Sequence, residues 1–462
     1  MTFSGLRLTG GTNNSVEIYD LQNAVAGWSS ATVAPFSPPL YPRMALLPNS
    51  KVFYSGHGSG GSSSSGWIFD PVARTWTASA ATTMDRSYGA SVLLPLLPPT
   101  YTPKVMALGG GNPATDTTEI IDLSATPPVW APGPRMSTGR IQMDAVLLPD
   151  GTVLALGGSV NNEAADVPGR KADLYRPASN NFDPNGAGAA SYSRLYHSTA
   201  LLLPDARVMS IGSNPANRGT YEPAMEIYTP AYLFDASDHL ITTARPNITG
   251  VSSGVIGYGA PFSVTYTATS AIRSAVLVRP GSVTHAFDMD QRLIGLCGPS
   301  PQPPCSGSGT LNLTSPPNGG IAPPGYYMLF LLDSNGVPSK AQFIQLTSHG
   351  SPPPVGAIAS PGTDVTIPAG SSVSFGTSTV AAKYSWIFPG GSPATSTAQN
   401  PGNVTFSTPG TYTASLTVVD ASGNSDPSPP TRVITVNPPT PDFSITVSPS
   451  AKVVNPGQSN TF

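Results

Sequence analysis

The chain has 462 residues, more than one ordinary domain usually holds, which predicts about three domains. Charged residues make up only 10% of the sequence, whereas it has 47 Gly and 52 Pro, a composition typical of turn-rich β structure. A net charge of −3 provides no basic surface, so we expect no nucleic-acid partner. No apolar run approaches the roughly 18 residues of a membrane span, and the first residues show no signal peptide.

One pattern recurs through the first half of the chain with a period of about fifty residues. It consists of an apolar strand, a polar turn, a second strand ending in glycine, and a third strand often followed by Trp. The strand pairs lie at residues 44–56, 90–110, 145–158 and 199–212, and the third strands at 16–20, 67–70, 119–122, 172–175 and 226–228. This pattern predicts that residues 1–230 form a partial kelch-type β-propeller of about four and a half blades.

The first blade begins abruptly. Residues 6–11 read as the second strand of a blade whose first strand is missing, which would leave an unpaired sheet edge. We therefore expect the chain to be truncated at its N-terminus. A strand-like segment at residues 442–447 breaks off before a domain could close, so we expect truncation at the C-terminus as well.

The repeat stops near residue 230, and short strands at sandwich spacing follow. Residues 231–348 predict an immunoglobulin-like domain, and residues 351–356 a stiff proline-rich linker. Residues 357–437 predict a second β-sandwich, and residues 438–462 a linker with the start of a further β domain. The fold class expected for the whole chain is all-β.

Only two cysteines are present, Cys297 and Cys305, on either side of a proline-rich loop. They could close a small disulfide or remain two free thiols. A zinc site is excluded as an interpretation, because no third or fourth ligand lies at zinc spacing. The disulfide is favoured, and with it an oxidising, extracellular setting.

Residues 194–215, reading R-L-Y-H-S-T-A-L-L-L-P-D-A-R-V-M-S-I-G-S-N-P, form the most informative stretch. It predicts a β-hairpin with Tyr196 and His197 at the entrance of its first strand. A second histidine in a similar setting, His285, lies in T-H-A-F-D-M-D-Q-R. Imidazole nitrogens and a phenolate oxygen suit tetragonal Cu(II), so these three side chains are candidate copper ligands.

These two motifs resemble the galactose oxidase and glyoxal oxidase group of copper radical oxidases. Residues 1–348 look like the later part of that group's kelch propeller followed by its immunoglobulin-like, early set C-terminal domain. Residues 357–437 resemble a PKD domain, a module that commonly decorates secreted microbial proteins. Such a module implies a polysaccharide or cell-surface partner.

The resemblance implies roles for individual residues. Tyr196 matches the group's axial tyrosine, which accepts a proton from the substrate and is the catalytic candidate. His197 and His285 match its two copper-ligating histidines, so that one copper ion is implied with Tyr196 as a third metal ligand. Gln291 and Arg292 are candidates for residues that do not bind the metal themselves but orient the loop of His285.

The group also carries its radical on a tyrosine cross-linked to a cysteine. The equivalent tyrosine would precede Met1, and neither cysteine of this chain lies in the propeller region. Tyr41 and Tyr88 head later blades and do not match it. The resemblance therefore implies a Tyr–Cys cofactor only in a full-length protein, and catalysis by this chain alone is doubtful.

Each candidate also has a purely structural interpretation. Tyr196, His197 and His285 could be packed or turn-capping side chains, and Gln291 with Arg292 a surface pair. His57, in Ser-Gly-His-Gly, could face the propeller axis, whereas His239 and His349 are expected to be solvated. The carboxylates of Asp288 and Asp290 lack a ligand-rich loop and are expected to be solvated rather than to bind calcium.

The function expected from these features is that of a fragment of a secreted copper radical oxidase. It would oxidise a primary alcohol or aldehyde, of a carbohydrate or a small carbonyl compound, with O2 and release H2O2. The alternative is a non-catalytic extracellular module that binds glycan or protein at a cell surface.

Overall fold

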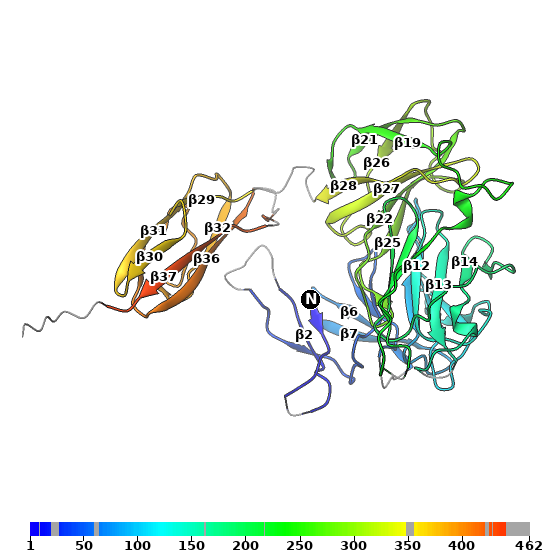
Figure 1. Cartoon of the computed structure of the whole chain (residues 1–462), viewed down its shortest axis with the longest axis horizontal. Coiled ribbons are helices and arrows are strands. Elements are labelled where there is room, and N and C mark those ends of the chain that lie inside the picture. Colours follow the sequence, from blue (N-terminus) through cyan, green and yellow to red (C-terminus); the bar gives the residue numbers. More distant parts are fainter. Residues whose placement is uncertain are drawn as a thin grey trace, which may run out of the picture. The chain divides into compact units, whose positions relative to one another are not determined.

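The computed structural model describes residues 1–8, 10–19, 27–59, 64–160, 163–216, 218–347, 355–420, 425–426 and 428–439. They form mainly antiparallel sheets and two single-turn 3-10 helices, η1 (Pro168–Arg170) and η2 (Ala231–Leu233), which confirms the all-β class. The chain divides into two compact units, Met1–Pro352 and Pro353–Phe462 (Figure 1).

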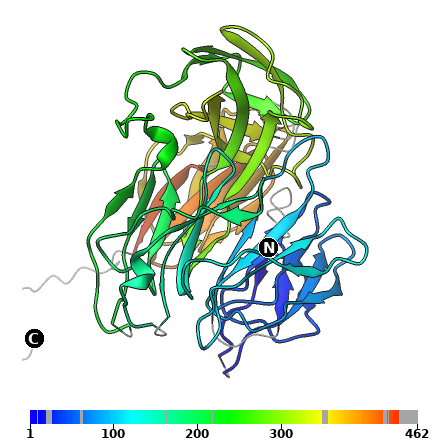
Figure 2. The ribbon, with the colours of Figure 1, turned by 90° about the vertical axis from the view of Figure 1, so that its right-hand side faces the viewer.

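Five small antiparallel sheets follow one another along the first half of the chain, and each is built from strands consecutive in sequence. Figure 2 shows them in blue, cyan and green. The first three comprise β1 (Thr2–Phe3), β2 (Ser15–Glu17) and β3 (Thr32–Val33); β4 (Met44–Leu46), β5 (Val52–Tyr54), β6 (Ser65–Asp70) and β7 (Thr75–Ala81); and β8 (Ala90–Leu93), β9 (Lys104–Leu108), β10 (Thr118–Asp122) and β11 (Trp130–Pro132).

The fourth and fifth sheets lie next to the candidate ligands. They comprise β12 (Ile141–Leu147), β13 (Val153–Ser159), β14 (Asp173–Arg176) and β15 (Asn181–Phe182), then β16 (Thr199–Leu202), β17 (Val208–Ile211) and β18 (Glu226–Tyr228). Consecutive strands in one sheet are typical of propeller blades, so the repeat correctly predicted the propeller architecture.

The expectation of a strand at residues 6–11 is wrong. Gly10 and Gly11 have left-handed φ angles of 88° and 77°, and the amide of Arg7 donates to the carbonyl of Gly11, which closes a turn. Leu6 is 75% exposed and Leu8 fully exposed. The strand that pairs with β2 is instead β1.

A buried ion pair fastens each of three successive sheets. The pairs are Arg86–Glu119 at 2.8 Å, Arg140–Asp173 at 2.8 Å and Arg194–Glu226 at 2.9 Å. Each guanidinium also donates to the carbonyl of the glycine that ends its second strand, Gly109, Gly157 or Gly212. These arginine side chains are at most 1% exposed, and a charge buried in this way is costly unless a carboxylate pairs with it.

The sheet of β4 to β7 lacks this ion pair, because Trp67 stands where the other sheets have the carboxylate. Aromatic stacking replaces it. The ring of Phe36 stacks on Tyr54 at 5.2 Å and on Trp67 at 5.1 Å, and meets Trp76 edge-on at 5.2 Å. This sheet, which precedes the candidate ligands in the chain, is therefore held by apolar contacts.

A β-sandwich follows the five sheets. One sheet has β21 (Pro261–Thr267) between β19 (Asn247–Val251) and β26 (Thr310–Thr314). The other has the order β20 (Val255–Gly257), β28 (Gln342–Thr347), β27 (Gly325–Asp333), β22 (Ile272–Arg279) and β25 (Arg292–Cys297). Cys297 and Cys305 form a disulfide, as the sequence favoured.

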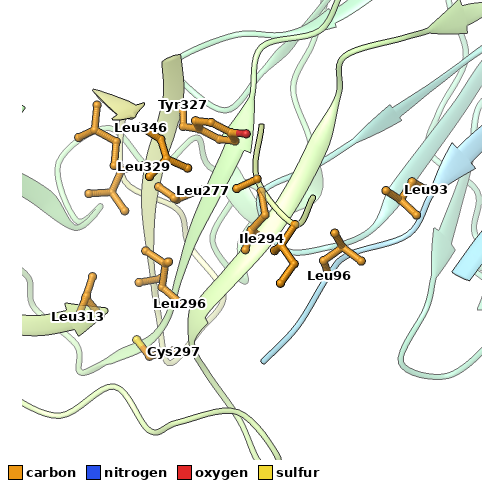
Figure 3. Packing of buried hydrophobic residues seen from close by; sticks show 14 of the residues in the cluster. Leu93, Leu96, Leu277, Ile294, Leu296, Cys297, Leu313, Tyr327, Leu329 and Leu346 are labelled. Atoms are coloured by element: carbon orange, nitrogen blue, oxygen red, sulfur yellow. The ribbon is translucent and has the colours of Figure 1, made fainter. Parts of the chain in front are cut away.

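The sandwich and the propeller sheets share one core. Leu96 forms a parallel bridge with Ile294 of β25, and Figure 3 shows both beside Leu93 and the sandwich residues Leu277 and Leu296. All five side chains are at most 7% exposed. Burial of large aliphatic side chains contributes about 1.5–3 kcal/mol each, so this junction fixes the sandwich relative to β4 and β8. These are the first strands of their sheets, and we call the first strand of each sheet its inner strand.

The second unit is a separate β-sandwich around Trp386, whose indole N–H donates to the carbonyl of Ala398 at 2.9 Å. Its strands are β29 (Ile358–Ser360), β30 (Val365–Pro368), β31 (Ser371–Thr377), β32 (Lys383–Ile387), β33 (Gly391–Ser392), β34 (Thr395–Ser396), β35 (Gly402–Phe406), β36 (Gly410–Val419) and β37 (Thr431–Asn437). The strand predicted at residues 442–447 lies outside the described residues.

The buried ion pairs give a first prediction. Asp173→Ala leaves the Arg140 charge buried without a carboxylate, so we expect the free energy of unfolding to fall by about 3–5 kcal/mol. Asp183→Ala is the matched control, because its partner Arg176 has a side chain that is 46% exposed, and exposed pairs contribute about 0–1 kcal/mol. Urea unfolding followed by tryptophan fluorescence measures both. Equal losses would contradict this account.

Candidate metal centre

One position of the propeller repeat has the same unusual backbone in four successive sheets. Tyr41, Tyr88, Gln142 and His197 have φ angles of 49°, 60°, 54° and 63°. Each lies seven residues before the proline that follows the inner strand. Left-handed φ is uncommon for residues with a side chain and clusters at functional sites. We call these four positions the rim.

His197 occupies the rim position just before β16. Its carbonyl is close to Gly212, where an added Cβ would lie 2.9 Å from that oxygen, so the chain needs glycine there. The Nδ1 atom of His197 donates to the Oδ1 atom of Asn214 at 3.0 Å. The Asn214 amide nitrogen in turn donates to the carbonyl of Thr220, which fixes this orientation. The Nε2 lone pair of His197 is thereby left free for a metal.

His285 comes from the sandwich. It lies in a hairpin between β23 (Val283–Thr284) and β24 (Phe287–Asp288), whose two-residue turn is His285 and Ala286. Both turn residues are left-handed, with φ of 51° and 61°, the conformation of a type I′ turn that usually selects Asn and Gly. The Nδ1 atom of His285 lies 2.7 Å from the hydroxyl oxygen of Thr284, so Nε2 is again the available nitrogen.

The structure brings the three predicted ligands together. The ring centroids of Tyr196 and His197 lie 3.8 Å apart, those of Tyr196 and His285 5.3 Å, and those of the two imidazoles 5.0 Å at an interplanar angle of 88°. Side chains that are 89 residues apart in sequence therefore converge on one point between the fifth sheet and the sandwich hairpin.

The electrostatic environment keeps His285 neutral. Partial burial, together with the smaller effects of the neighbouring His197, Arg43 and Arg218, lowers its pKa to about 4. A neutral imidazole is the form that binds a metal ion. His285 is therefore ready to act as a ligand at neutral pH.

Gln291 and Arg292 anchor the far end of the same hairpin. The amide oxygen of Gln291 accepts from the amide of Leu147 at 2.8 Å, and its nitrogen donates to the carbonyl of Ala145 at 2.8 Å. Arg292 is 5% exposed and donates to the carbonyl of Leu46. Both side chains thus tie the hairpin to inner strands of the propeller.

The half-exposed guanidinium of Arg218 lies over the ring of Tyr196. The sequence did not indicate this contact. The guanidinium carbon of Arg218 lies 4.0 Å from the Tyr196 ring centroid, an attractive cation–π contact. Glu163 binds Arg218 through both carboxylate oxygens, and the amide of the rim residue Gln142 donates to Glu163 at 2.7 Å. The sequence repeat does not mark Glu163 or Arg218, because both lie in loops after the strands that the repeat predicts.

Asp144 is a buried carboxyl next to the site that the sequence also missed. It is 2% exposed, and one oxygen accepts from the hydroxyl of Ser198 at 2.9 Å. Within the described part of the chain its other oxygen has no hydrogen-bond partner. Burial raises the pKa of Asp144 to about 7, despite the opposing hydrogen bond from Ser198.

The two other histidines that the structure describes do not join the three rings. His57 is 2% exposed, and among the described residues neither ring nitrogen has a hydrogen-bond partner. Burial lowers its pKa to about 3, so it is a neutral core histidine. His239 is an exposed side chain 3.7 Å from Asp235, and His349 lies outside the described residues.

The expected solvation of Asp288 is wrong. Its Oδ1 atom accepts from the backbone amides of Ser282, Asp290 and Gln291, and burial raises its pKa. The carboxylate closes the turn at the base of the hairpin. Asp290 instead lies at the surface, with its carboxylate 3.4 Å from Arg279.

Three families match the chain in order. Residues 31–232 match the glyoxal oxidase N-terminus, residues 245–346 the galactose oxidase-like early set domain, and residues 356–432 the PKD domain. This is a propeller fused to an early set domain, with a PKD domain behind it. Residues 31–346 therefore carry, in order, two domains named for glyoxal oxidase and galactose oxidase, which confirms the resemblance that the two motifs indicated.

Two relatives illustrate the likeness. The aldehyde oxidase GLOX of Vitis pseudoreticulata is 34% identical over 290 residues, which cover 56% of this chain and 53% of the relative. The galactose oxidase of Gibberella zeae is 32% identical over 258 residues, which cover 53% of this chain and 36% of the relative. The chain thus spans about half of the first protein and about a third of the second.

A solved structure supports the fold. A fungal alcohol oxidase in complex with copper matches with a TM-score of 0.53 and 23% identity, over 72% of this chain and 81% of that chain. Among the described residues of this protein, no helix is long and apolar enough to cross a membrane.

The raised pKa of Asp144 gives a second prediction. A carboxyl whose pKa rises from 3.8 to about 7 on folding lowers the free energy of unfolding progressively as pH increases between those values. The loss has an upper bound of about 4 kcal/mol, since one pKa unit corresponds to about 1.4 kcal/mol. Asp144→Asn should remove this loss when urea unfolding is compared at mildly acidic and mildly alkaline pH.

Asp183→Asn is the control for this pH series. The partner Arg176 lowers the pKa of Asp183, so its contribution to stability changes only in more acidic solution. If Asp144→Asn and the unmodified chain lose stability in parallel from mildly acidic to mildly alkaline pH, Asp144 does not carry the predicted proton.

Proposed function

We propose that this chain supplies the copper-binding half of a secreted copper radical oxidase that oxidises a primary alcohol or aldehyde with O2 and releases H2O2. The observation that carries the proposal is the convergence of Tyr196 and His197 with His285 from a separate domain. The substrate would be a carbohydrate or a small carbonyl compound, in line with the names of the two relatives.

The donor set fits copper. Two imidazoles offer Nε2 while their Nδ1 atoms are engaged, and a phenol oxygen completes a mixed N and O set. Among the described residues, no group of three His, Cys, Asp or Glu side chains could hold a metal ion. A zinc or calcium site is therefore a poorer fit for this part of the chain than a two-histidine copper site with tyrosine.

The residues present suggest a division of labour. His197 and His285 would hold the copper ion, and the partly exposed Tyr196, as its phenolate, would accept the hydroxyl proton of the substrate as general base. Arg218, stacked on the Tyr196 ring, would fix the orientation of that phenol. When bound, copper would supply one of the two one-electron steps that the oxidation requires.

The oxidation requires a second one-electron acceptor besides copper, and the cysteines of this chain cannot help to form it. Cys297 and Cys305 are joined to each other, so neither can form a thioether with a tyrosine. We propose that the Tyr–Cys cofactor belongs to the full-length protein. The disulfide also supports an extracellular location, because such bonds persist in oxidising compartments.

The lack of a cysteine for the thioether favours one other candidate function. A protein without the Tyr–Cys pair would be a non-catalytic extracellular module that binds glycan or protein. Peroxide production by the full-length protein with a panel of primary alcohols and aldehydes distinguishes the two functions. A full-length protein that binds copper at this site and still makes no peroxide would favour the binding module.

The proposal predicts distinct effects for the three ligands. His197→Ala and His285→Ala should each abolish stoichiometric Cu(II) binding, because a tetragonal site loses one of only two nitrogens. Tyr196→Phe should retain copper while peroxide formation by the full-length protein falls about 100-fold or more, the usual loss when a general base is removed. Copper content by elemental analysis and peroxide by a coupled assay provide the measurements.

His239→Ala serves as the matched control, because that histidine is exposed in a loop beside Asp235. It should leave copper content and peroxide formation unchanged. Retention of one copper per chain by both His197→Ala and His285→Ala would overturn the proposed site.

A further inference from the structure

We propose that Tyr41 and Arg43 are positioning residues that set the copper affinity of this site by holding His285. The inference rests on the proposed copper function and deepens it. Neither residue matches the motifs that indicated the ligands, and both belong to a different sheet from Tyr196 and His197.

Tyr41 holds the imidazole ring. Its ring lies parallel to that of His285, with centroids 3.6 Å apart and an interplanar angle of 12°. The perpendicular ring of His197 lies 5.0 Å away. Rotation of the His285 side chain about its χ angles would break the stack with Tyr41, so the stack selects the orientation that directs the ring to the shared point with His197.

Arg43 holds the backbone of the same residue. Its guanidinium is 1% exposed and donates to the carbonyl of His285 at 2.7 Å, to that of Tyr41 at 3.3 Å and to that of Gly89 at 3.1 Å. It also lies 5.3 Å from the ring of Phe287, the residue that follows the turn. One buried cation therefore joins the stacking tyrosine, the candidate ligand and the adjacent sheet.

The turn needs such support. His285 and Ala286 both adopt left-handed backbone, which is disfavoured for any residue that has a Cβ. A turn of this kind would relax to another conformation if its surroundings did not hold it. Arg43 on the carbonyl and Tyr41 on the ring are the contacts from the propeller that oppose this relaxation.

The rim explains why Tyr41 can reach the site. It occupies in the second sheet the position that His197 occupies in the fifth, with a similar left-handed backbone. The repeat thus places one side chain against the sandwich hairpin from each of these two sheets. In the fifth sheet that side chain is a ligand, and in the second sheet it is the support behind a ligand.

The test is Cu(II) affinity, measured by competition with a chelator on the full chain. Tyr41→Ala should weaken binding at least about 10-fold, the usual effect of removing a residue that orients a metal ligand. Tyr41→Phe keeps the stack and should stay within about threefold. Arg43→Met should also weaken binding, and Arg43→Lys should recover part of the loss, since one of its donors can still reach a carbonyl.

Tyr101→Ala is the matched control. Tyr101 is a partly buried tyrosine with φ of 49°, the same value as Tyr41, and it packs against the shared core rather than against His285. It should lower thermal stability without changing copper affinity. An equal loss of affinity in Tyr101→Ala would show a general folding effect and overturn the inference.

Imidazole spectra separate the positioning of His285 from general damage, because they report the contact between Tyr41 and His285 without copper. The chain has five histidines, so ¹⁵N-labelled imidazole spectra of the copper-free protein can report the same contact. Tyr41→Ala should shift the His285 signals and leave those of His239 unchanged.

The outcomes are distinguishable. Unchanged copper affinity in Tyr41→Ala, or unchanged His285 signals in its imidazole spectrum, would overturn the positioning role while leaving the proposed copper site intact. A chain that binds no copper through His197 and His285 would overturn the proposed function, and the affinity role of Tyr41 and Arg43 with it.

Discussion

The site depends on a turn that the backbone disfavours. His285 and Ala286 are both left-handed, and the ligand exists at the correct place only while this two-residue turn is maintained. Asp288 and Gln291 hold the base of the hairpin, and Arg43 holds its tip. The contacts of Gln291 and Arg43 join the hairpin to the propeller, whereas that of Asp288 lies within the hairpin. The sandwich therefore cannot present His285 correctly without the propeller sheets.

The propeller meets this requirement by being rigid where it faces the hairpin. Buried ion pairs such as Arg140–Asp173 fasten the start of an inner strand to the third strand of its sheet, and the apolar junction around Leu96 and Ile294 fixes the sandwich on the inner strands. Because a buried charge without its partner costs several kcal/mol, the three sheets that carry such a pair are each held in one register. The metal ligands thus lie next to elements that buried contacts hold in place.

The sequence predicted the strands and the ligands of this site better than the residues that hold those ligands in place. The hairpin after His197 and the strands of the sandwich follow from alternating apolar residues and turn residues, which act locally. Tyr41, Arg43 and Arg218 could not be found this way, because their contacts cross sheets and nothing in their own segments marks them. The rim could have been found by aligning the repeats on the proline after each inner strand. Residues 6–11 were misread because two glycines that resemble a strand end form a turn instead.

The most direct test of this account is a crystal structure of the chain soaked with Cu(II), with copper located by anomalous scattering. The account predicts one strong peak bonded to the Nε2 atoms of His197 and His285, with the Tyr196 phenol facing the same ion and Tyr41 still stacked behind His285. Copper bound instead at His57 or His239, with none between His197 and His285, would contradict it.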